Sequence, residues 1–101
     1  MPSKKVGDIL PEVMKGLGLD SKMRESQLIR QWPEIVGATV ASRSRPVVVR
    51  KSVLLVEVEN NAWMQEIRFH QRRIVDRIQK KFPELKVEGL RLVLEREREA
   101  E

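Results

Sequence analysis

The chain has 101 residues, no cysteine, and 20 basic against 15 acidic side chains, which gives a formal net charge of +5. This length suits one domain, because two domains of half the size would each bury too little apolar surface. No apolar run is long enough for a membrane span, and no apolar stretch follows the first lysines, so neither a span nor a signal peptide is expected. The lack of cysteine favours a reducing cytoplasm.

The first predicted helix starts near Ser3, which can accept a hydrogen bond as its N-cap. Pro11 lies inside the apolar stripe, so we expect a kink or a new start near Leu10. Gly16 and Gly18 end this segment.

A second helix is expected after Asp20 or Ser21, either of which can cap it, and it runs as far as Val36. Pro33 lies inside this segment and lacks the backbone N–H that a helix interior needs. We therefore expect the backbone to bend there, or a new turn to begin at Trp32.

Residues 46–59 predict a β-hairpin, because β-branched and leucine side chains dominate on both sides of Arg50-Lys51-Ser52. The turn contains no glycine, so its type stays open. Pro46 is acceptable at a strand start. The alternation with Glu57 and Glu59 places three side chains towards the core: Leu54, Val56 and Val58.

A long helix is predicted from about Ala62 to Lys81, capped by Asn60 or Asn61. A third strand follows, with Leu90, Leu92 and Leu94 on one face. The expected fold is therefore α+β in the order α-α-β-β-α-β, with one domain over residues 1–94. The charged tail, residues 95–101, is expected to fray.

Nothing in the chain indicates catalysis. His70 is the only histidine, cysteine is absent, and no phosphate-binding glycine motif is present. Glu57 and Glu59 are expected on the outer face of a strand, where two carboxylates are typical of a solvated edge. We therefore expect no enzyme activity, no metal, no cofactor and no small-molecule substrate.

Positive charge is concentrated in the middle of the chain. Residues 43–82 carry ten basic and four acidic side chains, whereas residues 83–101 carry four basic and six acidic ones. This distribution predicts a phosphate-binding surface; the alternative is a solvated face, or the charge-rich surface of a heat-adapted protein. The candidate nucleic-acid contacts are Arg43, Arg45, Arg50 and Lys51 beside the hairpin, and Arg72, Arg73, Arg77 and Lys80 on the long helix.

Three aromatic residues invite a functional interpretation. Phe69 falls beside these arginines, away from the core stripe, where it could stack on a base or fill a partner's pocket. The alternative is that Phe69 packs under one of the first two helices. Trp32 and Trp63 fall on apolar faces and are expected in the core, and Gly37 is expected to serve a tight turn.

The segments Trp32-Pro33-Glu34-Ile35-Val36-Gly37 and Asn60-Asn61-Ala62-Trp63-Met64-Gln65-Glu66-Ile67 flank the hairpin that Pro46 introduces. Their order and spacing resemble the DciA family, bacterial proteins that operate or load the replicative DnaB-type helicase. The resemblance implies a KH-like domain, with helices on one face of a three-stranded sheet. It also implies affinity for single-stranded DNA and for the helicase.

Two features depart from these patterns. KH domains grip nucleic acid with a G-x-x-G loop, which is missing here, and many family members carry a long basic C-terminal extension, whereas this sequence ends with an acidic balance. Weaker DNA binding is therefore expected.

We expect a nucleic-acid-binding accessory that recruits or loads the helicase, with Phe69 and Val6 or Leu10 as candidate anchors for the helicase. A protein adaptor with a basic surface and a KH-like RNA-binding protein remain alternatives.

Overall fold

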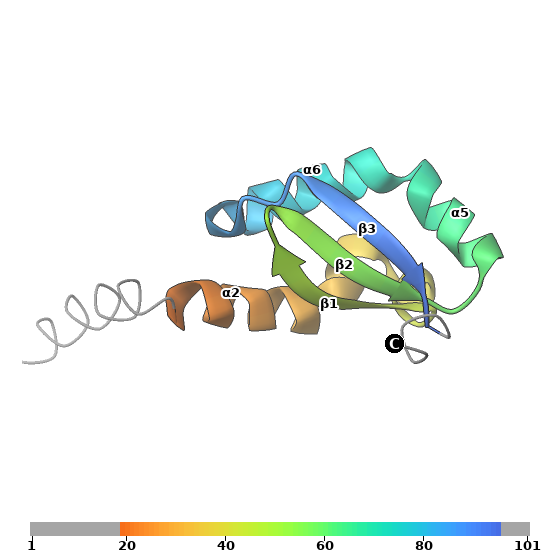
Figure 1. The fold of residues 1–101 in the computed structure, drawn as a ribbon, viewed down its shortest axis with the longest axis horizontal. Helices are drawn as coiled ribbons and strands as arrows, with labels where there is room; N and C mark the ends of the chain where they lie inside the picture. The colour runs from red at the N-terminus through yellow and green to blue at the C-terminus, as the bar shows by residue number, and fades with distance from the viewer. Residues whose placement is uncertain (1–18, 96–101) are drawn as a thin grey trace, which may run out of the picture.

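A computed structural model describes residues 19–95 of the protein (Figure 1). The predicted first helix, with Val6 and Leu10, and the tail from residue 96 lie outside these residues. The elements, in order, are α2 (Leu19–Arg30), α3 (Trp32–Val36), α4 (Ala38–Ala41), β1 (Ser44–Arg50), β2 (Val53–Val58), α5 (Asn61–Phe69), α6 (Gln71–Lys81), the 3₁₀ helix η1 (Pro83–Leu85) and β3 (Gly89–Leu94).

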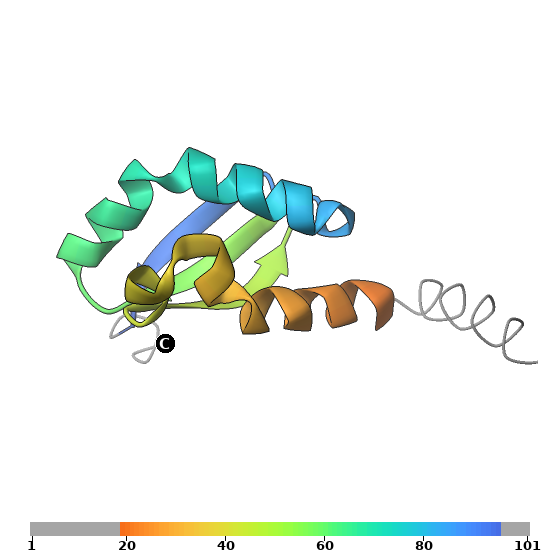
Figure 2. The same ribbon diagram turned by 180° about the vertical axis from the view of Figure 1, so that it is seen from behind.

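The three strands form one mixed sheet in the order β1-β2-β3. The central strand β2 is antiparallel to β1 and parallel to β3. A parallel neighbour requires a crossover connection, which α5, α6 and η1 supply. The helices cover one face of the sheet, as the views from opposite sides show (Figures 1 and 2). The predicted α+β class is therefore confirmed.

The core lies between the sheet and the helix layer. Leu54, Val56 and Val58 of β2 are 0% exposed, which confirms their predicted inward direction. Leu90 and Leu92 of β3 pack against the same cluster, as the alternation in that strand predicts. The helices complete the core with the apolar side chains Leu28, Trp32, Ile35, Ile67, Ile74 and Ile78.

The second predicted helix is divided at Gln31. Helix α2 already begins at Leu19, so Asp20 and Ser21 lie in its first turn and the prediction that one of them caps it is wrong. Helix α3 begins at Trp32 with Pro33 in its first turn, where a missing N–H costs no helical hydrogen bond. The predicted new turn at Trp32 is confirmed.

Gly37 lets the chain change direction between α3 and α4. Its φ of +92° and ψ of 154° define a backbone conformation that side-chain-bearing residues rarely adopt. Its N–H donates to the Pro33 carbonyl and ends α3. Gly37 therefore serves a turn, as the sequence predicts.

The hairpin starts two residues earlier than predicted, so Pro46 is the third residue of β1 and not its first. Proline is tolerated there because β1 is an edge strand and the register shifts between Pro46 and Val48. The turn contains Lys51 and Ser52 at φ values of +50° and +68°, a left-handed conformation that favours glycine or asparagine.

The long helix predicted from Ala62 to Lys81 is two helices. Asn60 caps α5, since its side-chain oxygen accepts a hydrogen bond from the N–H of Trp63 at 3.0 Å. The chain then breaks at His70, whose φ of −101° and ψ of 11° depart from helical values. The apolar stripe continues through both helices, which is why periodicity alone indicates a single element.

Candidate nucleic-acid interface

Phe69 lies at the end of α5 and is 84% exposed. Its only ring contact among residues 19–95 is edge-to-face with the adjacent His70, at 5.2 Å between centroids. The alternative that it packs under a helix is therefore wrong for the described part of the chain. A large apolar side chain held in water is a candidate contact residue.

Four basic residues flank Phe69 or follow it along the same helices. Arg68 lies in the last turn of α5, and α6 contributes Arg72, Arg73 and Lys80. All four are exposed, because Ile67 takes the buried side of α5 while Ile74, Val75 and Ile78 take that of α6. We call Arg68, Phe69, Arg72, Arg73 and Lys80 the α5–α6 ridge.

The cations of the α5–α6 ridge form no ion pair with any residue from 19 to 95. Asp76 is the one acidic residue of α6 and is exposed beside them. Glu66 of α5 is engaged by His70, at 3.3 Å between Oε1 and Nε2. The ridge therefore carries a clear excess of positive charge that is available to an anionic ligand.

Arg77, predicted as a nucleic-acid contact, has a partner inside the fold. Its Nη1 donates to the Ile35 carbonyl at 2.8 Å and so ties α6 to the end of α3. One turn further on, Lys81 reaches Glu34 at 3.2 Å. These two cations join the helices to each other, so Arg77 is not grouped with the ridge.

Arg43 and Arg45 are paired with acids across the hairpin. Arg43 lies 3.1 Å from a carboxylate oxygen of Glu59, and Arg45 pairs with Glu57. Glu57 is only 5% exposed, so the expectation of a solvated Glu57 is wrong. The register places Arg45 directly opposite Glu57, which lets the guanidinium cover the carboxylate.

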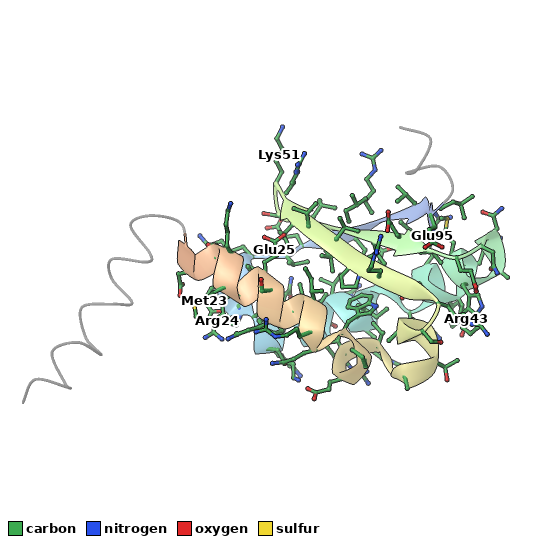
Figure 3. All side chains as sticks on the ribbon, turned by 90° about the horizontal axis from the view of Figure 1, so that it is seen from below. Met23, Arg24, Glu25, Arg43, Lys51 and Glu95 are labelled. Atoms are coloured by element: carbon green, nitrogen blue, oxygen red, sulfur yellow. The ribbon has the colours of Figure 1, made fainter. Side chains whose placement is uncertain are left out.

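Arg50 and Lys51 lie at the other end of β1. A strand of this length separates Arg43 from Arg50 by about 20 Å, at roughly 3.3 Å per residue. Figure 3 shows Arg43 and Lys51 at opposite ends of the sheet, with Lys51 pointing away from the helices. The α5–α6 ridge lies on the helix layer, so the two predicted clusters do not form one groove.

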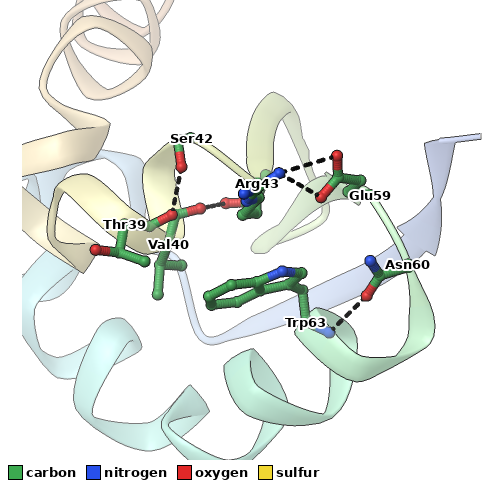
Figure 4. A network of polar contacts seen from close by, with 8 residues as sticks. Thr39, Val40, Ser42, Arg43, Glu59, Asn60 and Trp63 are labelled. Atoms are coloured by element: carbon green, nitrogen blue, oxygen red, sulfur yellow. Dashed lines mark hydrogen bonds and ion pairs between the residues drawn. The ribbon is translucent and has the colours of Figure 1, made fainter.

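The two tryptophans differ in burial. Trp32 is 2% exposed, and its indole Nε1 donates to the Ser44 hydroxyl at 3.0 Å, which confirms its core position. Trp63 is half-buried and packs against the core from its edge. Figure 4 shows its indole beneath the Arg43–Glu59 ion pair, where the start of β1 meets the start of α5.

Residues 19–95 hold neither a metal-binding cluster nor a membrane-spanning helix. No group of three or more histidine, cysteine or acidic side chains there could hold a metal ion. No helix in that range has the length and apolarity needed to cross a membrane. What the described residues do offer is an exposed aromatic beside unpaired arginines.

Sequence reasoning did not select Arg68 or Arg91. Arg68 could have been found from its place next to Phe69, since an exposed aromatic and an adjacent arginine often act together. Arg91 belongs to β3, and only the strand pairing shows which neighbours it has.

The fold and the α5–α6 ridge together define a small α+β domain whose surface is suited to binding an anionic ligand. A family model described as "Dna[CI] antecedent, DciA" matches residues 5–92. The chain therefore belongs to the DciA family.

Curated relatives agree with this assignment. A UPF0232 protein of Mycobacterium ulcerans is 27% identical over 73 residues, which cover 72% of this chain and 39% of the relative. A UPF0232 protein of Rhodococcus jostii is 28% identical over 71% of this chain and 38% of its own length. A UPF0232 protein of Mycobacterium tuberculosis is 29% identical over 72% of this chain and 39% of its own length. The chain thus matches about two fifths of each of these relatives.

Proposed function

We propose that the protein binds single-stranded DNA through the α5–α6 ridge and, in replication, recruits or loads the DnaB-type helicase at that DNA. The observation that carries the DNA part is the 84% exposure of Phe69 beside Arg72 and Arg73. An aromatic ring next to arginines suits a single strand, because unpaired bases offer a face for stacking while the arginines meet the phosphates.

Single strands fit the ridge better than duplex DNA does. A duplex keeps its bases stacked inside, so Phe69 could contact only the backbone or a groove edge. The ridge is short, because it spans only the end of α5 and helix α6, and this limits it to a few nucleotides. Its four cations would release about four counterions at most, so the expected log–log salt slope is no steeper than about −3.

The helicase part rests on family membership and on the chemistry of the chain. The sequence holds no nucleotide-binding loop, so energy from hydrolysis is not expected to come from this protein. Its effect on a helicase ring would have to come from binding one state of the ring better than another.

Fluorescence anisotropy with a labelled thymidine oligonucleotide of about 12 nucleotides, at roughly 50 mM salt, tests the DNA proposal. We expect the wild type to bind and Arg72→Glu/Arg73→Glu to lose at least about tenfold in affinity, with a salt slope about 1.4 units shallower. Arg77 is left unchanged in this variant because its hydrogen bond to Ile35 supports the fold.

The matched control is Lys22→Glu/Arg30→Glu on α2, which reverses two exposed charges far from Phe69 in the chain. Its net charge equals that of the ridge variant, so any loss due to overall charge alone is the same in both. Equal losses in the two variants would remove the ridge as the site. If the wild type itself fails to bind, the DNA proposal is wrong and the adaptor alternative gains support.

Helicase recruitment is tested separately with the replicative helicase of the same organism. We expect direct association of the two proteins in a binding titration, and more helicase on a single-stranded substrate when this protein is added. No association with the helicase, either nucleotide-free or nucleotide-bound, contradicts the helicase part and leaves the DNA part standing.

A further inference from the structure

The outer face of the sheet, opposite the helix layer, is defined by the strand register. Three rows of paired residues cross it: Arg45, Glu57 and Val93; then Val48, Leu55 and Arg91; then Arg50, Val53 and Gly89. These residues point away from the core because their neighbours Leu54, Val56 and Val58 point into it. We call the three rows the outer sheet face.

None of the helices within residues 19–95 packs on this face. Val53 is 37% exposed, and Val48, Leu55 and Val93 are half-buried, whereas the inward residues of β2 are fully buried. Figures 1 and 3 show the same arrangement, with the helices gathered on the opposite side of the sheet. The outer sheet face is thus uncovered by the described elements.

The composition of the outer sheet face is unusual for a solvated surface. A sheet with one wet side normally alternates apolar and polar residues along its strands. Strand β2 instead begins Val53-Leu54-Leu55-Val56, which is apolar on both sides. Such a run is typical of a strand buried on both faces, so the sequence pattern indicates a covering layer.

Charge indicates what kind of layer fits. Arg45 and Arg50 lie on one edge strand and Arg91 on the other, with Lys51 at the turn. The only carboxylate in the three rows is Glu57, which Arg45 engages. The apolar centre is therefore flanked on both sides by guanidinium groups, and Arg50, Lys51 and Arg91 form no ion pair within residues 19–95.

We propose that the outer sheet face docks an amphipathic helix of a partner protein, with an apolar stripe between acidic flanks. A helix is about 10 Å across, and the two outer strands of a three-stranded sheet lie about 10 Å apart. The apolar stripe of the partner helix would therefore lie over β2, and the carboxylates of that helix would lie over β1 and β3. The partner is a segment of the replicative helicase, so this inference rests on the proposed function.

The area makes the contact a transient one. Three strands of six or seven residues cover about 300 Å², well below the roughly 800 Å² per partner of a stable interface. DNA and the helicase segment bind opposite layers of the domain in this arrangement, so both can be held at once. That is the geometry required to bring a helicase to single-stranded DNA.

Two substitutions test the outer sheet face from different directions. Leu55→Lys removes the apolar centre and keeps the positive charge, while Arg91→Glu keeps the centre and reverses a flank. We expect each to weaken helicase binding by at least about tenfold, as truncation of a central interface contact does. Both should leave oligonucleotide binding within about twofold of wild type, because the ridge lies on the other layer.

Retained oligonucleotide binding and an unchanged circular dichroism spectrum show that the variants fold. Arg30→Glu on α2 is the matched charge control for Arg91→Glu and should bind the helicase like wild type. Amide shifts in ¹⁵N-labelled protein upon addition of helicase should map to Val48, Leu55 and Val93, and not to Phe69.

Three outcomes overturn the inference while leaving the proposed function intact. The wild type binds helicase and both variants bind it equally well; or the helicase leaves the amides of Val48, Leu55 and Val93 unshifted; or Leu55 in the free protein shows contacts with residues 1–18, residues 96–101 or a second copy. If the wild type binds no helicase at all, the helicase proposal fails first, and this inference fails with it.

Discussion

Replacing Ser44 with alanine tests how the Trp32 segment is held against the hairpin. The Ser44 hydroxyl accepts from the Trp32 indole N–H at 3.0 Å and donates to the Val40 carbonyl at 2.7 Å. The Val40 carbonyl keeps a second donor, the N–H of Arg43 at 3.0 Å, but the indole N–H has no other hydrogen-bond acceptor among residues 19–95. Trp32 is 2% exposed, so the indole N–H loses its acceptor inside the fold when the Ser44 hydroxyl is removed.

Ser44→Ala should lower the free energy of unfolding by about 1–3 kcal/mol, because it leaves the buried Trp32 indole N–H without an acceptor. For a domain of this size each kcal/mol lowers Tm by roughly 4–8 °C. Thermal and urea unfolding followed by circular dichroism measure the change. Ser42→Ala is the matched control, because its hydroxyl is exposed and donates only to the Thr39 carbonyl, so we expect a change within about 0.5 kcal/mol.

A double-mutant cycle isolates the hydrogen bond itself. Trp32→Phe removes the indole N–H, so Ser44→Ala should cost about 1 kcal/mol less in that background than in the wild type. Equal costs in the two backgrounds, within about 0.3 kcal/mol, would refute the reasoning, because the two side chains would then act independently.

Three further changes test single features of the fold by the same unfolding measurements. Gly37→Ala should destabilise by about 1–3 kcal/mol although no atom lies within 4 Å of the added Cβ, since the cost comes from φ of +92° alone; an unchanged Tm contradicts this. Ser52→Gly should stabilise by up to about 1 kcal/mol by relieving the left-handed conformation at the hairpin turn, and a lower Tm would show that the turn is not strained. Trp63→Ala should cost less than Trp32→Ala, for which about 3–5 kcal/mol is expected, because Trp63 is only half-buried; the reverse order would contradict the burial.

Ion pairs and hydrogen bonds within the fold change how the basic residues are interpreted. By count, residues 43–82 carry ten cations, but Arg43, Arg45 and Lys81 are paired with acids and Arg77 with a carbonyl. The charge left for a ligand is divided between the α5–α6 ridge and the hairpin turn, where Arg50 and Lys51 lie. A net positive charge in a stretch of sequence therefore overstates the charge that any one surface can offer.

Local chemistry determined much of the fold in advance. The period-two pattern around Leu54, Val56 and Val58 predicts their burial because alternate side chains of a strand point to opposite faces whatever the tertiary context. Pro33 predicts a bend or a new turn at Trp32, because a missing N–H is tolerated in a first turn, and α3 begins there. Local chemistry also predicts a cap at Asn60 or Asn61, and the structure selects Asn60.

Tertiary structure alone decided the features that depend on distant partners. The break at His70 interrupts no periodicity, so the apolar stripe continues through it and gives no sign of the bend. Arg77 and Ile35 are 42 residues apart, and no local pattern relates a guanidinium to a carbonyl at that separation. Likewise, composition places the basic residues in one stretch of chain. Only the packing of the helices on a single side of the sheet separates the α5–α6 ridge from Arg50 and Lys51 at the hairpin turn. The physical reason is that a charged side chain points away from the core that its own helix or strand covers.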